Sequence, residues 1–115
     1  MKFNEEAVEL ARILEENRDL LIALGDEVRQ HLIVTMLSSG NPGGQRVGEI
    51  AASANLSRPA VSHHLQILKE VGVVDVRHEG TRNYYFFCQD EQIYDRLIHI
   101  VTLARKCALR KNEES

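Results

Sequence analysis

The sequence has little cysteine and no long apolar run, and each absence excludes a class of protein. Only two of the 115 residues are cysteine, too few for the disulfide framework on which many small secreted domains depend. No stretch approaches the ~18 apolar residues that a membrane-spanning helix requires. Residues 1–17 are acidic and amphipathic, unlike a secretory signal, which is basic and then apolar. These absences predict a cytoplasmic protein without a membrane partner.

A strong excess of basic charge is also missing, because 14 Lys and Arg stand against 17 Asp and Glu. The acid gathers in residues 1–30, where eight acidic side chains face four basic ones. In residues 57–82 four basic side chains face three acidic ones, and three histidines are added. This distribution indicates a mildly basic face and argues against promiscuous nucleic-acid binding. A DNA complex of such a chain should gain affinity from dimerisation.

The motifs of common enzymes are absent as well. Composition predicts a loop at residues 38–44, but no Lys-Ser or Lys-Thr follows it, which excludes a P-loop. We interpret this loop as a surface insertion. The pair His63-His64 has no carboxylate at the spacing of a zinc protease site, and no Ser or Cys lies in a nucleophile elbow. We therefore expect a protein that is not an enzyme and that uses no cofactor and no metal.

Among the features present, residues 46–85 are predicted to form two short helices followed by a β-hairpin. The first helix carries Val47, Ile50 and Ala51 at helical spacing, so one face points inward. It should end at Asn55, since Asn tolerates the left-handed backbone that a tight turn between two helices needs. This pattern is typical of a helix-turn-helix unit.

The second helix combines strong start signals with a polar outer face. Ser57 is a good N-cap and Pro59 falls in the first turn, so the helix should begin at Arg58. Its buried stripe recurs at i, i+4 and i+7: Val61, Leu65 and Leu68. The open face carries donors and almost no acid: Arg58, Ser62, His63, Gln66 and Lys69. Such groups suit base edges and phosphates, which favours a DNA recognition helix over a merely solvated surface.

The hairpin that follows has a basic tip. Residues 73–77 and 82–87 are rich in β-branched and aromatic side chains, and a Glu-Gly-Thr turn lies between them. Arg77, His78 and Arg82 bracket this turn. A basic tip after a recognition helix is what a wing needs to reach the phosphate backbone and an adjacent minor groove. Charge on an exposed hairpin also protects its edges from pairing, so the order of the parts carries the interpretation.

Four short motifs in residues 56–85 resemble one known family. They are LSRPAVSHHL at 56–65, LKEVGVV at 68–74, RHEG at 77–80 and the Tyr pair at 84–85, and they resemble the ArsR/SmtB family of bacterial repressors over roughly residues 19–108. The resemblance implies a mainly α fold with a β-hairpin wing (α+β), the winged helix-turn-helix. It also implies a homodimeric repressor of double-stranded DNA with a palindromic operator, released by an effector. The predicted DNA contacts are Ser57, Arg58, Pro59, Ser62, His63, His64, Gln66, Arg77, His78 and Arg82.

Apolar spacing predicts further helices on either side of this unit. The segment before Gly25 is strongly apolar, and Asp26 can cap a helix whose inward residues would be Val28, Leu32, Ile33, Met36 and Leu37. At the amino end, a narrow seam is formed by Phe3, Ala7, Leu10 and Leu14. After a cap at Asp90, one long stripe is formed by Ile93, Leu97, Ile100, Val101, Ala104 and Ala108.

The resemblance assigns the two terminal helices to a two-fold interface. We predict one domain over residues 1–115, with the helix-turn-helix and wing at 46–88 and dimerisation helices at 1–16 and 90–110. A stripe of nearly five turns is more than one small core needs at its end. The predicted dimer residues are Leu10, Leu14, Ile93, Leu97, Ile100, Val101 and Ala104.

The metal sites of this family are missing at their usual positions. The cysteine pattern would fall on residues 47–54, which contain no Cys. The pattern of the last helix needs Asp-x-His, yet Leu97 follows two positions after Asp95, and no His follows His99. The resemblance therefore implies a regulator that does not respond to zinc, cadmium or arsenite.

Two thiols remain, and the hypotheses about the effector of the regulator differ in the role that they give to these thiols. Cys88 and Cys107 are interpreted as packing residues, with a redox function as the alternative. The trigger would then be an organic ligand, thiol oxidation or no small molecule at all. For the whole chain, the rival to a DNA-binding regulator is a winged-helix module that binds proteins, which the weak local charge would suit.

Overall fold

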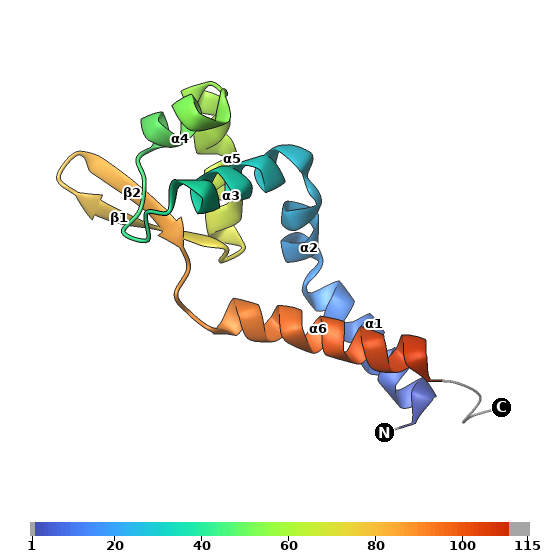
Figure 1. Cartoon of the computed structure of the whole chain (residues 1–115). Helices are drawn as coiled ribbons and strands as arrows, with labels where there is room; N and C mark the ends of the chain where they lie inside the picture. The colour runs from blue at the N-terminus through green and yellow to red at the C-terminus, as the bar shows by residue number, and fades with distance from the viewer. Residues whose placement is uncertain (1, 111–115) are drawn as a thin grey trace. The chain divides into compact units, whose positions relative to one another are not determined.

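The structure, a computed structural model, describes residues 2–110, in which six helices accompany one hairpin (Figure 1). The elements are α1 (Phe3–Glu16), α2 (Arg18–Gly25), α3 (Glu27–Ser39), α4 (Val47–Ala54), α5 (Arg58–Glu70), β1 (Val74–Glu79), β2 (Arg82–Phe87) and α6 (Gln92–Leu109). The predicted mainly α fold with a β-hairpin is confirmed. Residues 19–89 form one compact unit, and the two terminal segments form a second. The organisation as a single domain stays a prediction.

The core of the unit of residues 19–89 lies where α3, α4, α5 and the base of the hairpin meet. Its buried members are Leu32, Met36, Ile50, Ala51, Ala54, Val61, Leu65, Leu68 and Val74. The stripe predicted for α5 is confirmed, because all three of its side chains have no exposed surface. Burial of a side chain of this size contributes ~1.5–3 kcal/mol, so this stripe anchors α5 and leaves its opposite face to solvent.

The junction between α4 and α5 follows the sequence signals closely. Asn55 has a φ of 57° and ends α4 in the left-handed region. The N–H of the next residue, Leu56, donates a hydrogen bond to the Ala51 carbonyl at 3.1 Å. The Ser57 hydroxyl accepts a hydrogen bond from the Ala60 N–H at 3.3 Å, and α5 begins at Arg58. The predicted turn, N-cap and start of the helix are confirmed.

A first prediction follows from the backbone of Asn55, the one described non-glycine residue with a positive φ. Asn55→Ala should lower the free energy of unfolding by roughly 1–2 kcal/mol, because a Cβ without a polar group is disfavoured in this region. Asn55→Gly is the matched control and should leave stability unchanged or slightly higher, since Gly accepts this φ. Urea denaturation of the three proteins measures the difference. Equal losses for Ala and Gly would show that the Asn side chain, and not the backbone, matters.

The hairpin is longer than predicted on its first strand. In the antiparallel register, Val74 pairs with Phe87 and Glu79 pairs with Arg82. The expected strand ended at residue 77, but the ladder continues because only Gly80 and Thr81 form the turn, with Gly80 at a φ of 62°. A positive φ in a two-residue turn matches the twist of the strands. The basic tip is therefore narrower than the sequence suggested.

Helix α3 begins at the predicted residue, but the side chain of Asp26 makes a different interaction from the expected cap. Asp26 has the extended backbone of an N-cap, yet its side chain makes no capping hydrogen bond. Its carboxylate instead lies 3.8 Å from the Arg29 guanidinium. Arg29 is buried, and its Nε donates to the Ala23 carbonyl at 2.8 Å. The expected Asp26 cap is wrong because this arginine, placed three residues further on, attracts the carboxylate.

The end of α3 also differs from expectation. The helix runs through Ser38 and Ser39, which were assigned to a loop, and ends at Gly40 with a φ of 65°. Both serine hydroxyls donate to carbonyls of the preceding turn, at 2.8 Å each, so they satisfy their polar groups inside the helix. Leu37, expected to face inward, is 62% exposed, and Val28 and Ile33 are only half-buried. The inward face is centred on Leu32 and Met36.

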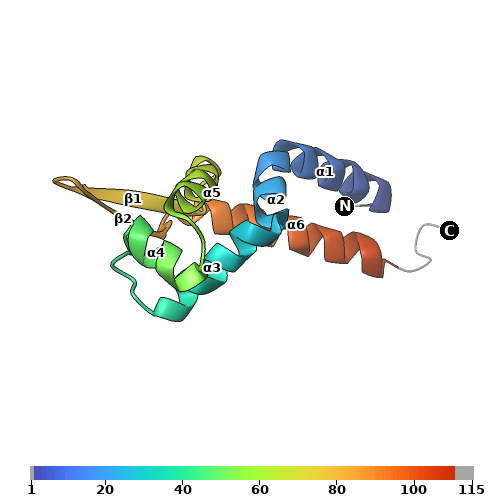
Figure 2. The same ribbon diagram turned by 90° about the horizontal axis from the view of Figure 1, so that it is seen from above.

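In the second unit, α1 packs against α6, and Figure 2 shows the two helices side by side. Their contact is formed by Ile13, Ile100 and Leu103, with Leu10 packed against them. The predicted seam of α1 is rotated in the structure, because Phe3 and Leu14 are exposed. Among residues 2–110 no helix combines the length and apolar character needed to cross a membrane.

Charged side chains add to this helix pair. Glu6 is buried and pairs with Arg110 at the end of α6. On the outer surface, the hydrogen bond from Arg12 lowers the pKa of the Glu9 carboxyl. At the other end of α6, the Asp90 carboxylate accepts a hydrogen bond from the Gln92 N–H at 3.0 Å, but the N-cap of the helix is Glu91, one residue after the predicted cap.

Candidate nucleic-acid interface

The outer face of α5 presents the polar groups that the sequence assigned to DNA. Arg58, Ser62, His63 and Gln66 are exposed, as are Ser57 and Pro59 at the start of the helix. Gln66 donates to Glu70 on the same helix at 3.3 Å. Because the opposite stripe is fully buried, this face is held rigidly. It offers hydroxyl, imidazole and guanidinium groups along one side of an exposed helix.

His64 is placed differently from its neighbour His63. Its ring is half-buried, and Nδ1 lies 3.3 Å from the Arg29 guanidinium on α3. Since the guanidinium can only donate, the Nδ1 of His64 is the acceptor in this contact. The interaction ties α5 to α3. His64 thus has a structural partner, Arg29, inside the unit. The sequence alone did not predict this contact.

Arg58 leans over the start of α4. Its Nη2 lies so near Gly48 that a Cβ there would approach it to 2.9 Å. Arg46 and Arg58 line a hollow of about 360 Å³ together with Gly48, Glu49 and Ala52. Arg46, which the sequence analysis overlooked, is exposed at the N-cap of α4. A basic residue just before a helix start was the signal that could have found it, because helix N-termini favour phosphate.

Arg77 is occupied within the structure. Its guanidinium donates to the Gly43 carbonyl at 2.7 Å and to the Glu79 carboxylate at 2.8 Å. It also lies 4.9 Å from the centre of the Tyr84 ring, within range of a cation–π interaction. Arg77 therefore fastens the wing to the loop between α3 and α4. The sequence did not predict this role, because Gly43 lies 34 positions before Arg77.

The two remaining basic side chains of the wing differ in whether they have a partner within the hairpin. The His78 Nδ1 lies 2.6 Å from the Asn83 side-chain oxygen across the hairpin. The side chain of Arg82 is exposed and makes no hydrogen bond or ion pair within the part of the chain that the structure describes. Its charge is available to an external anion.

The part of the chain that the structure describes contains both possible metal ligands and two thiols. Within residues 2–110 no group of three or more His, Cys, Asp and Glu side chains is placed to hold a metal ion. Cys88 follows β2, half-buried, and its N–H donates to the Val73 carbonyl at 3.0 Å. Cys107 is half-buried on α6, in the other unit. A redox role for either cysteine stays a prediction.

Comparison with known proteins identifies the family. The model described as "bacterial regulatory protein, arsR family" matches residues 28–76, from α3 to β1. The HTH-type transcriptional regulator MJ1325 of Methanocaldococcus jannaschii is 37% identical over 76 residues, which make up 66% of this chain and 82% of that protein. The chain belongs to the ArsR family. This ArsR-family protein is a transcriptional regulator, as the sequence predicted.

Further relatives extend the picture. The transcriptional repressor SdpR of Bacillus subtilis is 36% identical over 63 residues, 55% of this chain and 66% of that protein. A solved structure of a possible transcriptional regulator for arsenical resistance is 30% identical, with a TM-score of 0.58, over 82% of this chain and 98% of that one. A homodimeric winged helix-turn-helix DNA-binding domain from Mycobacterium bovis has a TM-score of 0.60 at 24% identity, over 91% and 93%. The predicted winged helix-turn-helix fold is confirmed.

Proposed function

We propose that this ArsR-family regulator is a homodimeric repressor that binds a palindromic operator in double-stranded DNA and acts in the cytoplasm. The observation that carries the proposal is the outer face of α5, which is polar, exposed and backed by a stripe without exposed surface. Regulators with this fold place such a helix in the major groove. The family relatives are transcriptional regulators, and SdpR is a repressor. Release by an effector belongs to this proposal.

In this proposal the groups around α5 divide the work. Ser62 and His63 reach base edges, and Gln66 lies further along the same face. Arg58 and Arg46 meet the phosphates beside the start of α4, with Ser57 and Pro59 at the edge of the contact. Arg82 touches the flanking backbone. His64, Arg77 and His78 already have partners within the unit, and we assign them to holding α5 and the wing in place.

The proposed dimer uses apolar surface on the unit formed by α1 and α6. Tyr94, Ile98 and Val101 recur at i, i+4 and i+7, and Ile98 and Val101 are 62% and 65% exposed. Val8 on α1 is also exposed. Ile93 and Ile100, which the sequence placed at the interface, are buried within the chain, and Leu97 and Ala104 are half-buried. The interface is therefore proposed on the neighbouring face of α6. The solved domain from Mycobacterium bovis is homodimeric.

Selection of an operator from a random pool of DNA duplexes tests the function. The purified protein should enrich one inverted repeat, and gel-shift titration should show a dimer on each duplex. Half-sites should lie about one helical turn apart, ~34 Å, to match two α5 helices. Failure to enrich any sequence, with the protein folded, would refute the DNA-binding proposal and favour the protein-interaction module.

A second prediction concerns salt. Arg82→Ala should weaken operator binding and reduce the slope of log affinity against log salt by about one unit per half-site, because one phosphate contact is lost from each. Arg18→Ala is the matched control, since Arg18 is exposed on α2 and belongs neither to the outer face of α5 nor to the wing, and it should leave the slope unchanged. Titrations at several salt concentrations measure both. An unchanged slope for Arg82→Ala would remove the wing from the phosphate contacts.

A further inference from the structure

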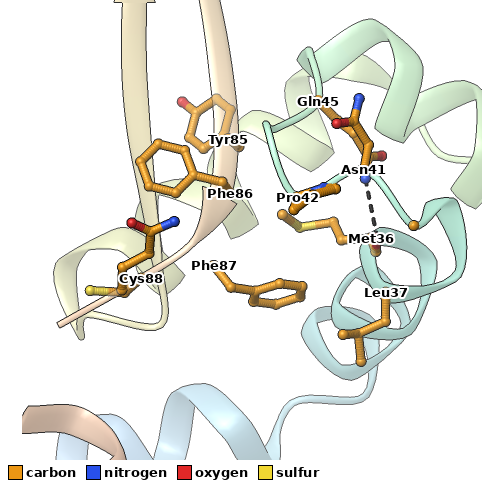
Figure 3. Close-up of a pocket in the computed structure, with 11 residues that line it drawn as sticks. Met36, Leu37, Asn41, Pro42, Gln45, Tyr85, Phe86, Phe87 and Cys88 are labelled. Carbon is orange, nitrogen blue, oxygen red and sulfur yellow. Dashed lines mark hydrogen bonds between the residues drawn. The ribbon is translucent and has the colours of Figure 1, made fainter. Parts of the chain in front are cut away.

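A cleft of about 460 Å³ opens between the end of α3, the following loop and β2 (Figure 3). In Figure 3 the Phe87 ring extends from β2 toward Leu37 of α3, and Met36 and Pro42 lie between strand and helix. All of the lining residues belong to the unit of residues 19–89. The volume lies within the ~300–1,000 Å³ range of small-molecule sites.

The lining defines the chemistry of an occupant. None of the eleven lining residues is Asp, Glu, Lys, Arg or His, so a charged ligand would lose its hydration without gaining an ion pair. Phe86, Phe87 and Met36 supply aromatic and thioether surface, which suits a flat ring. Asn41 and Gln89 add side-chain amides able to bond one polar group. The lining therefore selects a small, uncharged, ring-containing organic molecule.

One wall of the cleft is already fixed. Gln45 is 5% exposed, and its amide nitrogen donates to the Met36 carbonyl at 3.2 Å and to the Ser39 hydroxyl. A rigid wall lowers the ordering cost of binding. Such a wall on the inner side of the loop distinguishes the cleft from a surface hollow lined only by mobile side chains.

The same residue joins the wing to the helix-turn-helix. The Gln45 N–H donates to the Tyr85 carbonyl at 2.9 Å, and the Tyr85 N–H donates to the Gln45 carbonyl at 2.8 Å. Gln45 directly precedes Arg46, the N-cap of α4, while Tyr85 lies in β2. A molecule held between α3 and β2 would thus contact both residues of a backbone pairing that joins the wing to the residue before the N-cap of α4.

We propose that this cleft binds a small, uncharged aromatic molecule and that its occupancy changes operator affinity through the Gln45–Tyr85 pairing. The binding half of the proposal concerns the single chain. The regulatory half rests on the proposed function, because it needs an operator complex to act on.

N-phenyl-1-naphthylamine, an uncharged fluorescent aromatic amine, tests the binding half without DNA. Fluorescence titration of the full chain should saturate at one probe per chain. Leu37→Asp should weaken binding about tenfold or more, because it places a carboxylate at the rim of an apolar site. Val34→Asp is the matched control. Val34 is 58% exposed and lies one turn earlier on α3, but it does not line the cleft, so probe affinity should be unchanged.

Two results of the probe titration would contradict the binding half of the proposal. Absence of saturable fluorescence, or equal loss in Leu37→Asp and Val34→Asp, would overturn the cleft as the site and would place any bound probe elsewhere, for example between two copies of the chain. Circular dichroism of both variants confirms that they fold. Since both positions are largely exposed, unfolding is not the expected cause of a loss.

The regulatory half is tested with the selected operator. Saturating probe should change operator affinity of the parent about fivefold or more, within the range of allosteric coupling, and should leave Leu37→Asp unaffected. Bound probe with unchanged operator affinity would overturn the regulatory half. If no operator were found, the proposed function would fail while the probe titration still decided the site, so the two failures are distinguishable.

Discussion

Replacing Val101 with Glu should convert the protein from a dimer into a monomer that holds its operator weakly. Val101 is 65% exposed beside Ile98 on α6, and in the proposed dimer this face is covered by the second copy. A carboxylate there would be buried without a partner, which is strongly unfavourable. Loss of the second recognition helix removes the bivalent contact, so operator affinity should fall by ~10²–10⁴. Sedimentation equilibrium and gel-shift titration measure the two effects.

Gln92→Glu provides the matched control for this variant. Gln92 is exposed at the start of the same helix, where an added acid is compatible with the helix dipole. It should leave both the dimer and operator binding intact. A parent protein that sediments as a monomer, or a Val101→Glu protein that dimerises normally, would contradict the proposed interface.

Loss of either Ser62 or His63 should weaken specific binding while the dimer and the fold remain. Each lost base contact should cost ~1–3 kcal/mol of operator affinity. Neither side chain makes a hydrogen bond to another described residue, both are exposed, and His63 has only an edge contact with the His64 ring at 5.3 Å between centroids, so Ser62→Ala and His63→Ala should change stability little. Titration against the selected operator and against a shuffled duplex separates specific from non-specific affinity.

Ser38→Ala serves as the control for these substitutions. Ser38 is an exposed serine at the end of α3 that donates only to the Val34 carbonyl among the described residues. Its loss should leave operator affinity unchanged. If Ser62→Ala and His63→Ala also bound the operator like the parent, the docking of α5 in the groove would be wrong.

The parts of this fold that the sequence determined by itself depend on neighbours within a few residues. Asn55 specified a left-handed turn and Ser57 capped the next helix, because each acts on its own or an adjacent backbone. The stripe through Leu65 followed from helical periodicity. Local interactions of this kind can be identified from spacing and residue type alone. They place the α5 outer face on an exposed helix before any tertiary contact is known.

Tertiary structure decided which apolar and charged groups are satisfied. Periodicity marked α6 as apolar on a broad face, but only the packing of Ile100 against Ile13 divided that face into a buried side and an exposed side around Val101. Arg29 and Arg77 have partners 35 and 34 residues away along the chain. Residue type and spacing do not show which of such distant groups will meet. A pattern shows that a side chain needs a partner, whereas only the folded chain determines which group supplies it.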